Sequence, residues 1–134
     1  NHISSGKGYV GIHSAADSFR DCPEYRSMVG GHFITHPHYR EYQVSITDSE
    51  HPITEDLVEF NVTDEQYILD YDHRVNVLAS ALHKGSMMPV VWTKNWGQGR
   101  VFYLALGHDK KACQHDNFAI LLQRGALWAG TLET

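Results

Sequence analysis

The sequence predicts an α/β domain built on buried strands, and three features of the chain point to it. Two short apolar runs, residues 8–12 and 101–106, lead into His13 and into Gly107-His108-Asp109. Short runs that are apolar on both faces are typical of central strands in an open α/β sheet. An amphipathic pattern over residues 117–129 predicts a C-terminal helix. Ligands bind at the carboxyl ends of such strands, so a histidine at two of these ends predicts a site.

The N-terminal part predicts one buried strand followed by short helices. Residues 9–13 form a parallel central strand, and residues 14–19 begin a helix that Pro23 limits to a turn or two. A second short helix over residues 24–29 stops at Gly30-Gly31.

The middle of the chain predicts loops around one strand. Residues 32–39 are expected to be a loop, because Pro37 and the doubled glycine before it oppose regular structure. The alternation of apolar and polar residues over 42–47 predicts a half-exposed strand. A turn-rich connection over residues 48–54 leads into a short helical turn at residues 55–58.

The C-terminal half predicts more strands and the helix. Strands at residues 60–62 and 75–79 enclose polar loop segments at 64–67 and 70–73. A β-hairpin is expected from residues 89–93 and 100–106, which face each other across Asn95–Gly99. In the final helix one face carries four apolar residues, with a cap before it and a glycine after it: Phe118, Leu121, Leu122 and Trp128, with Asp116 and Gly130.

Composition indicates one domain over residues 1–134 and excludes two classes of partner. The chain is 42% hydrophobic and carries a net charge of −5, with 11 Lys and Arg residues scattered singly. No basic stripe is present to neutralise a phosphate backbone, so nucleic acid is excluded. No apolar run approaches the roughly 20 residues that cross a bilayer, so no membrane partner is expected. Cys22 and Cys113 have no CxxC spacing, which predicts free thiols in a reducing, cytoplasmic compartment.

Eight short motifs, taken in order along the chain, carry a family resemblance. They are Gly8–Ala15, Val29–Phe33 with His36-Pro37, His51–Thr54, Asp64–Tyr67, Pro89–Trp92, Gly99–Tyr103, Gly107–Asp109 and Gly125–Ala129. Together they resemble the trehalose-utilisation (ThuA-like) family. The resemblance implies a fold like that of class I glutamine amidotransferases, with a flavodoxin-like parallel sheet flanked by helices. It also implies an N-terminally incomplete domain, because the family carries further strands before the Tyr9 strand.

His13 distinguishes two kinds of chemistry. In amidotransferases with this kind of fold, a nucleophilic cysteine stands on the sharp turn after a Gly-containing strand, and His13 occupies the matching position here. Cys-dependent glutaminase chemistry is therefore not expected. His13 is predicted to be a catalytic base, a metal ligand or a substrate donor, unless it only caps the strand by bonding a backbone carbonyl. Ser14 is a candidate substrate-binding residue, since the Gly-x-Ser-x-Gly elbow of a serine nucleophile is absent.

His108 and Glu65 complete the candidate catalytic set with His13. Gly107 permits a tight turn before His108, and Asp109 either orients the imidazole or caps the next helical segment. Glu65 follows a predicted strand with Tyr67 close by, which suits an acid/base group beside a partner for sugar hydroxyls. The alternative for Glu65 is a solvated acidic loop.

The ten histidines include a cluster between residues 32 and 38. His32 and His36 are four residues apart, but the neighbouring glycines and Pro37 oppose the helix that an HxxxH zinc site needs. His36 joins Ser14, Tyr67 and Asp109 as a candidate substrate-binding residue. A divalent metal such as zinc, held by His13 and His108, is the candidate cofactor. Trp92 is assigned to the core, and Trp96 is left open as core or as a platform for a sugar ring.

Two functions from different classes stay open. The first is an enzyme of carbohydrate utilisation that acts on trehalose or a keto-disaccharide by hydrolytic or eliminative chemistry at a histidine-rich pocket. The second is a non-catalytic sugar-binding or accessory module on the same fold. A small-molecule sugar is the expected partner in both, and a homo-oligomer is left open. If His13 and His108 share a ligand, their side chains must lie close together.

Overall fold

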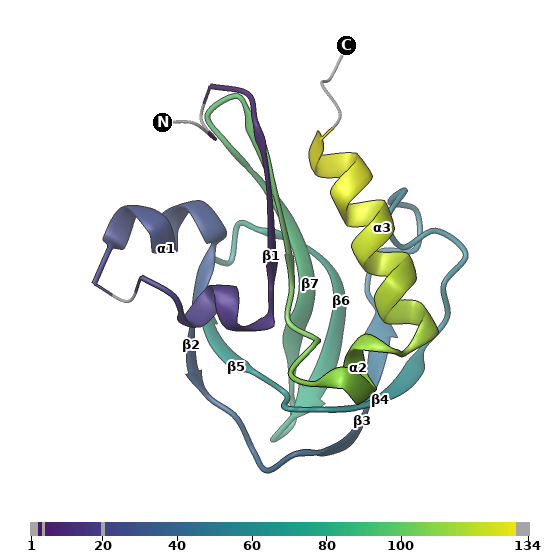
Figure 1. Ribbon diagram of the computed structural model, residues 1–134. Coiled ribbons are helices and arrows are strands. Elements are labelled where there is room, and N and C mark those ends of the chain that lie inside the picture. Colours follow the sequence, from purple (N-terminus) through teal and green to yellow (C-terminus); the bar gives the residue numbers. More distant parts are fainter. Residues whose placement is uncertain (1–2, 4, 20, 131–134) are drawn as a thin grey trace.

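A computed structural model describes residues 3, 5–19 and 21–130 of the chain. Its main element is a six-stranded mixed sheet of order β1-β8-β7-β6-β3-β4, accompanied by a two-stranded ribbon of β2 and β5 (Figure 1). The elements in chain order are β1 Gly8–Ile12, η1 His13–Asp17, α1 Pro23–Val29, β2 Gly31–Thr35, β3 Arg40–Ile46, β4 Phe60–Asp64, β5 Ile68–Tyr71, β6 Asn76–His83, β7 Ser86–Trp96, β8 Gly99–Leu104, α2 Lys110–Cys113 and α3 Asp116–Gly130.

The two strands that the sequence marked with histidines are neighbours. β1 pairs with β8 in parallel, with Gly8 opposite Arg100 and Ile12 opposite Leu104. Their carboxyl ends therefore lie side by side at one end of the sheet, where β1 continues into η1 and β8 leads toward α2 (Figure 1). His13 is the first residue of η1, and His108 lies between β8 and α2.

The predicted α/β class is confirmed, but the described sheet is mixed rather than the parallel one that was expected. Apart from β1 with β8, the strand pairs are antiparallel: β2 with β5, β3 with β4 and with β6, β6 with β7, and β7 with β8. The short turns after His83 and after Trp96 explain much of this, because a parallel neighbour needs a crossover of a dozen or more residues. The predicted hairpin is confirmed and is longer than expected.

Helices cover the two faces of the sheet, as the α/β prediction requires. α3 lies against β8 and β1 on one face, and α1 lies on the other (Figure 1). Gly125 permits the close approach of α3, because a Cβ there would come within 2.3 Å of the Phe102 ring. Phe118 and Leu121 are buried beneath the helix. The predicted C-terminal helix is confirmed.

Trp92 anchors the opposite face, and its predicted place in the core is confirmed. Its side chain is fully buried, and its indole N–H donates to the carbonyl of Val29 at 2.8 Å. The ring packs on Tyr103 at 4.6 Å between ring centroids. α1 ends at Val29, and the next residue, Gly30, has a φ of +100° and stops the helix as predicted.

Three local predictions are wrong. The segments 32–39 and 70–73, expected to be loop, overlap β2 and β5, and these two strands pair with each other. Gly31 serves close approach instead of breaking structure, since a Cβ there would meet the Trp92 ring at 2.9 Å. Residues 55–58 form no helical turn, because the hydrogen bonds of residues 51–57 close turns instead. None of the helices within the described residues is long and apolar enough to cross a membrane.

Candidate active site

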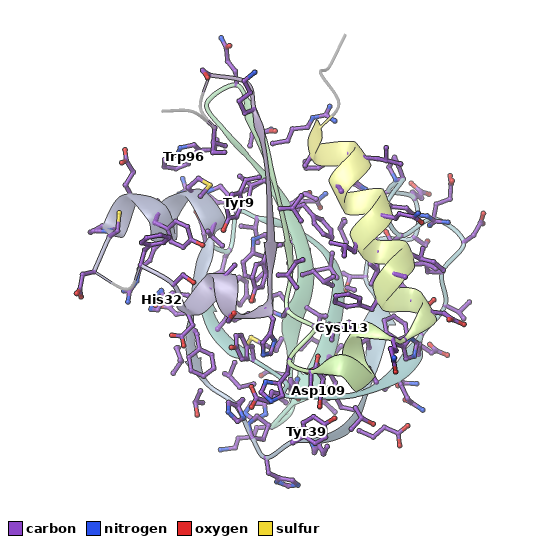
Figure 2. The ribbon with its side chains drawn as sticks, in the orientation of Figure 1. Tyr9, His32, Tyr39, Trp96, Asp109 and Cys113 are labelled. Carbon is purple, nitrogen blue, oxygen red and sulfur yellow. The ribbon has the colours of Figure 1, made fainter. Side chains whose placement is uncertain are left out.

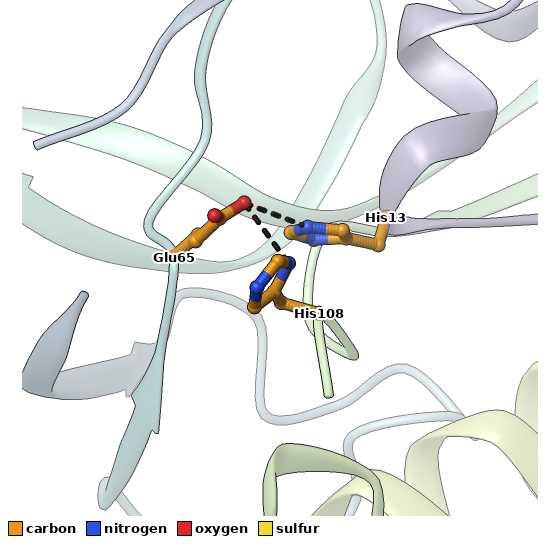
Figure 3. Close-up of side chains that lie close together, drawn as sticks. All are labelled: His13, Glu65 and His108. Atoms are coloured by element: carbon orange, nitrogen blue, oxygen red, sulfur yellow. Dashed lines mark ion pairs between the residues drawn. The ribbon is translucent and has the colours of Figure 1, made fainter. Parts of the chain in front are cut away.

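Three side chains from separate parts of the sequence meet at the carboxyl ends of β1 and β8 (Figure 3). Glu65 follows β4, and its Oε1 lies 3.4 Å from His13 Nε2 and 3.1 Å from His108 Nδ1. The two imidazole rings are 5.6 Å apart between centroids. The prediction that His13 and His108 lie close together is confirmed, and a carboxylate stands between them.

His13 occupies a sharp turn at the end of β1. Its φ of +46° lies in the left-handed region, which is unfavourable for a residue with a Cβ and is concentrated at functional sites. Its Nδ1–H donates to the carbonyl of Ala105 at 2.8 Å, and the Tyr67 ring packs on the imidazole at 3.9 Å between centroids. The capping bond expected of a structural histidine is therefore present, but it uses Nδ1 and leaves Nε2 facing Glu65.

Asp64 holds the site together, and sequence reasoning missed it. Its side chain is fully buried and accepts backbone N–H bonds from Glu65 at 2.9 Å, Gly107 at 2.8 Å and His108 at 3.0 Å. Burial raises the pKa of Asp64, and these N–H bonds partly oppose the increase. One sequence feature could have identified Asp64 as buried. Phe60, Val62 and Asp64 alternate along β4, which places all three side chains on its buried face.

Glu65 is not part of a solvated loop, because only 17% of its side chain is exposed. Its second oxygen, Oε2, lies 3.5 Å from Nε2 of His36, whose Nδ1–H donates to the carbonyl of Pro37 at 2.6 Å. His32 instead lies 3.8 Å from Asp70, so the two histidines of the HxxxH spacing do not share a site.

Two further predicted residues lie around this cluster in structural roles. Asp109 accepts the backbone N–H of Ala112 at 3.1 Å and so caps α2. Its hydrogen bond with the Tyr39 hydroxyl raises the pKa of Tyr39 to about 12. Figure 2 shows Tyr39 and Asp109 at the same end of the molecule. Ser14 is exposed in η1, and its carbonyl accepts the Ser18 hydroxyl. The substrate-binding roles of Ser14, Tyr67 and Asp109 stay predictions.

Neither cysteine is placed as a nucleophile on the turn after β1. Cys22 and Cys113 are both free, as predicted, and both are exposed. Cys113 lies near the site and its Sγ contacts the carbonyl of Gly107 at 3.7 Å, but burial raises the pKa of its thiol. A raised pKa favours the unreactive thiol over the thiolate. The site therefore offers imidazole and carboxylate chemistry.

The fold and this cluster define an α/β protein with an imidazole–carboxylate site at the carboxyl ends of two parallel strands. The chain belongs to the ThuA family: the family model described as trehalose utilisation matches residues 1–129. The predicted family is confirmed. No curated protein sequence matches the chain.

Solved structures share the fold of this chain. A ThuA-like protein from Parabacteroides merdae is 25% identical, with a TM-score of 0.87 over 97% of this chain and 62% of its own. A ThuA-like protein from Bacteroides uniformis is 24% identical, with a TM-score of 0.78 over 96% of this chain and 60% of its own. A β-galactosidase from Bacillus circulans shares the fold at 11% identity, with a TM-score of 0.65 over 98% of this chain and 20% of its own. The chain thus spans about 60% of the length of the two ThuA-like structures.

Proposed function

We propose that this protein acts in carbohydrate utilisation and cleaves trehalose or a keto-disaccharide at the cluster of His13, Glu65 and His108. The observation that carries the proposal is a carboxylate, 17% exposed, whose two oxygens face three imidazoles. The trehalose-utilisation description of the matching family supports the class of substrate. Groups that exchange protons near neutral pH and lie within reach of one carboxylate suit general acid–base catalysis.

The site has a buried side and an open side, which suits a small substrate. His13 is buried, whereas 42% of the His108 side chain and 35% of the His36 side chain are exposed. A sugar hydroxyl or keto oxygen can therefore reach His108 and His36 from solvent. Tyr67 packs behind His13 and holds the ring in place. We assign Ser14, His36, Tyr67 and Asp109 to substrate binding within this proposal.

Two reactions fit these groups. In hydrolysis, the water oxygen bonds to the anomeric carbon as the glycosidic C–O bond breaks; one group accepts the water proton and another protonates the leaving oxygen. In elimination from a keto sugar, a base removes the proton on the carbon next to the carbonyl. The C–O bond at the following carbon then breaks, and its oxygen takes up a proton. We assign these proton transfers to Glu65 and His108, whose Oε1 and Nδ1 atoms lie 3.1 Å apart.

A non-catalytic sugar-binding function is the second candidate, and one feature favours it. An open groove of about 560 Å³ is lined by Trp96, Trp128 and His51 together with polar residues from β7 and the loop before β6. Indole rings beside amide and carboxylate groups are suited to sugar rings. Figure 2 places Trp96 at the opposite end of the molecule from Tyr39 and Asp109, so this groove is separate from the histidine cluster.

Product analysis separates these alternatives. The protein is incubated with trehalose and with its keto derivative, and the products are followed by NMR and mass spectrometry in ¹⁸O-labelled water. Hydrolysis places ¹⁸O in the released sugar, whereas elimination first gives an unlabelled unsaturated product. His108→Ala is expected to abolish product formation, and His38→Ala, which alters an exposed histidine, is the matched control. Binding of both sugars by the wild-type protein without any product would favour the binding module instead.

The remaining proposals concern location and partners. We place the protein in the cytoplasm, where its two exposed free cysteines stay reduced. A small-molecule sugar is the proposed partner. Association between copies is left open, because β1 forms one edge of the described sheet.

A further inference from the structure

We propose that His13, Glu65 and His108 form a binding site for one divalent transition-metal ion of the zinc class. Each of the three residues offers one ligand atom, and these three atoms all lie within 4.8 Å of one another. Toward Glu65 the facing nitrogens are His13 Nε2 and His108 Nδ1. The role of the ion in sugar cleavage rests on the proposed function. The binding of the ion is inferred only from the positions of the three side chains.

The hydrogen bonding of His13 leaves one ring nitrogen free for a metal. The carbonyl of Ala105 can only accept, so His13 Nδ1 carries the hydrogen and Nε2 of the neutral ring presents a lone pair. Nε2 is buried and has no hydrogen-bond partner, and it faces Glu65 Oε1 at 3.4 Å. A cation between these two atoms satisfies both lone pairs. An imidazole whose other N–H donates to a backbone carbonyl is the usual form of a metal-binding histidine.

One of the two distances around Glu65 matches the spacing of metal ligands. Zinc binds nitrogen and oxygen ligands at about 2.0–2.2 Å, which separates neighbouring ligands of a tetrahedron by roughly 3.3–3.6 Å. The His13 to Glu65 distance is 3.4 Å and the His108 to Glu65 distance is 3.1 Å. Charge-assisted hydrogen bonds between nitrogen and carboxylate are shorter, at about 2.7–2.9 Å. The His13 distance in particular fits two ligands of one ion better than a direct bond.

The donor set selects the kind of ion and its use. Two imidazoles and one carboxylate suit zinc and its first-row neighbours, whereas magnesium and calcium prefer oxygen ligands. Three protein ligands leave a position for an oxygen of water or substrate, as in catalytic zinc sites. An ion here polarises a keto or hydroxyl oxygen of the sugar. With the ion bound, Glu65 and His108 serve as its ligands. His36, which faces the other oxygen of Glu65, then replaces them as the proton-transfer group of the metal-free scheme.

Metal titration of the chelator-treated protein tests the site. We expect one equivalent of Zn²⁺ in isothermal titration calorimetry, visible d–d absorption bands with Co²⁺, and no binding of Mg²⁺ at the same concentration. His108→Ala removes one ligand, and Glu65→Gln replaces the anionic carboxylate ligand by a neutral amide oxygen. Each variant is expected to weaken Zn²⁺ binding by more than about 100-fold, beyond the effect of losing an outer-shell partner. His38→Ala is the control for binding by exposed histidines. Circular dichroism checks that each variant folds.

The outcomes separate this inference from the proposed function. Absence of a one-to-one Zn²⁺ complex in the wild-type protein, or equal affinity in His108→Ala and His38→Ala, overturns the metal site. A Zn²⁺ complex lost in both ligand variants supports the site, even if no sugar is cleaved and the proposed function fails. Sugar cleavage that continues at full rate in metal-free protein overturns the use of the ion and leaves the proposed function standing.

Discussion

Replacement of Asp64 by Asn tests whether one buried carboxylate positions the site. Asp64 Oδ2 accepts the N–H of Gly107, and Oδ1 accepts the N–H groups of His108 and Glu65. Asparagine has one acceptor oxygen, so at least one of these N–H groups would face the amide NH₂. An unsatisfied buried donor costs about 1–3 kcal/mol, and the remaining bonds lose their charge assistance. The removed desolvation cost of the charge offsets part of this, so we expect a loss of about 2 kcal/mol.

Urea unfolding followed by tryptophan fluorescence measures this effect. With a slope of about 2 kcal/mol per molar urea, the midpoint of Asp64→Asn should fall by roughly 1 M. Asp70→Asn is the matched control, because 67% of the Asp70 side chain is exposed and its ion pair with His32 spans 3.8 Å. An exposed pair of this kind contributes under about 1 kcal/mol. Equal midpoints for the two variants would refute the positioning role of Asp64.

Two other predictions concern packing and charge. Gly125→Ala should lower the free energy of unfolding by about 1–2 kcal/mol, because the new Cβ meets the buried Phe102 ring at 2.3 Å. Gly130→Ala in the same helix is the control, because a Cβ there meets open space. This control should be neutral or stabilising in thermal denaturation. Equal melting temperatures would contradict the packing argument. The Arg74 guanidinium beside Asp72 lowers the pKa of that carboxyl from 3.8 to about 2, so its contribution to stability is present above pH 4 and is lost as the pH falls toward 2. In Arg74→Ala, a carboxyl NMR titration should show a higher pKa for Asp72, although the backbone N–H of residue 74 still lowers it in part. An unchanged pKa would contradict the assignment.

The sequence predicts the parts of the candidate site whose positions depend only on neighbouring residues. Apolar runs that end in His13 and in Gly107-His108 required buried strands with their carboxyl ends at one edge, and the structure brings these ends together. Glu65 followed from its place directly after a strand. In each case the signal lies within a few neighbouring residues.

The features of the fold and the site that the sequence did not predict depend on contacts between distant segments. β2 and β5 are short and stabilise each other, and neither has a strong strand pattern alone. The alternation along β4 places Asp64 on the buried face, but no local pattern specifies its hydrogen bonds to the backbone of Gly107 and His108, which lie in a distant segment. The direction of the strands likewise depends on turn lengths and pairing partners, so a family likeness implied more parallel pairing than the described sheet contains.

The central claim is that the carboxylate of Glu65 takes part in sugar cleavage. The most direct test is the steady-state rate of keto-disaccharide breakdown by Glu65→Gln, which keeps the size of the side chain and removes its charge. We predict a fall of at least about 100-fold in kcat relative to the wild-type protein, with an unchanged melting temperature within about 2 °C. A rate within twofold of wild type in a folded variant would contradict the claim.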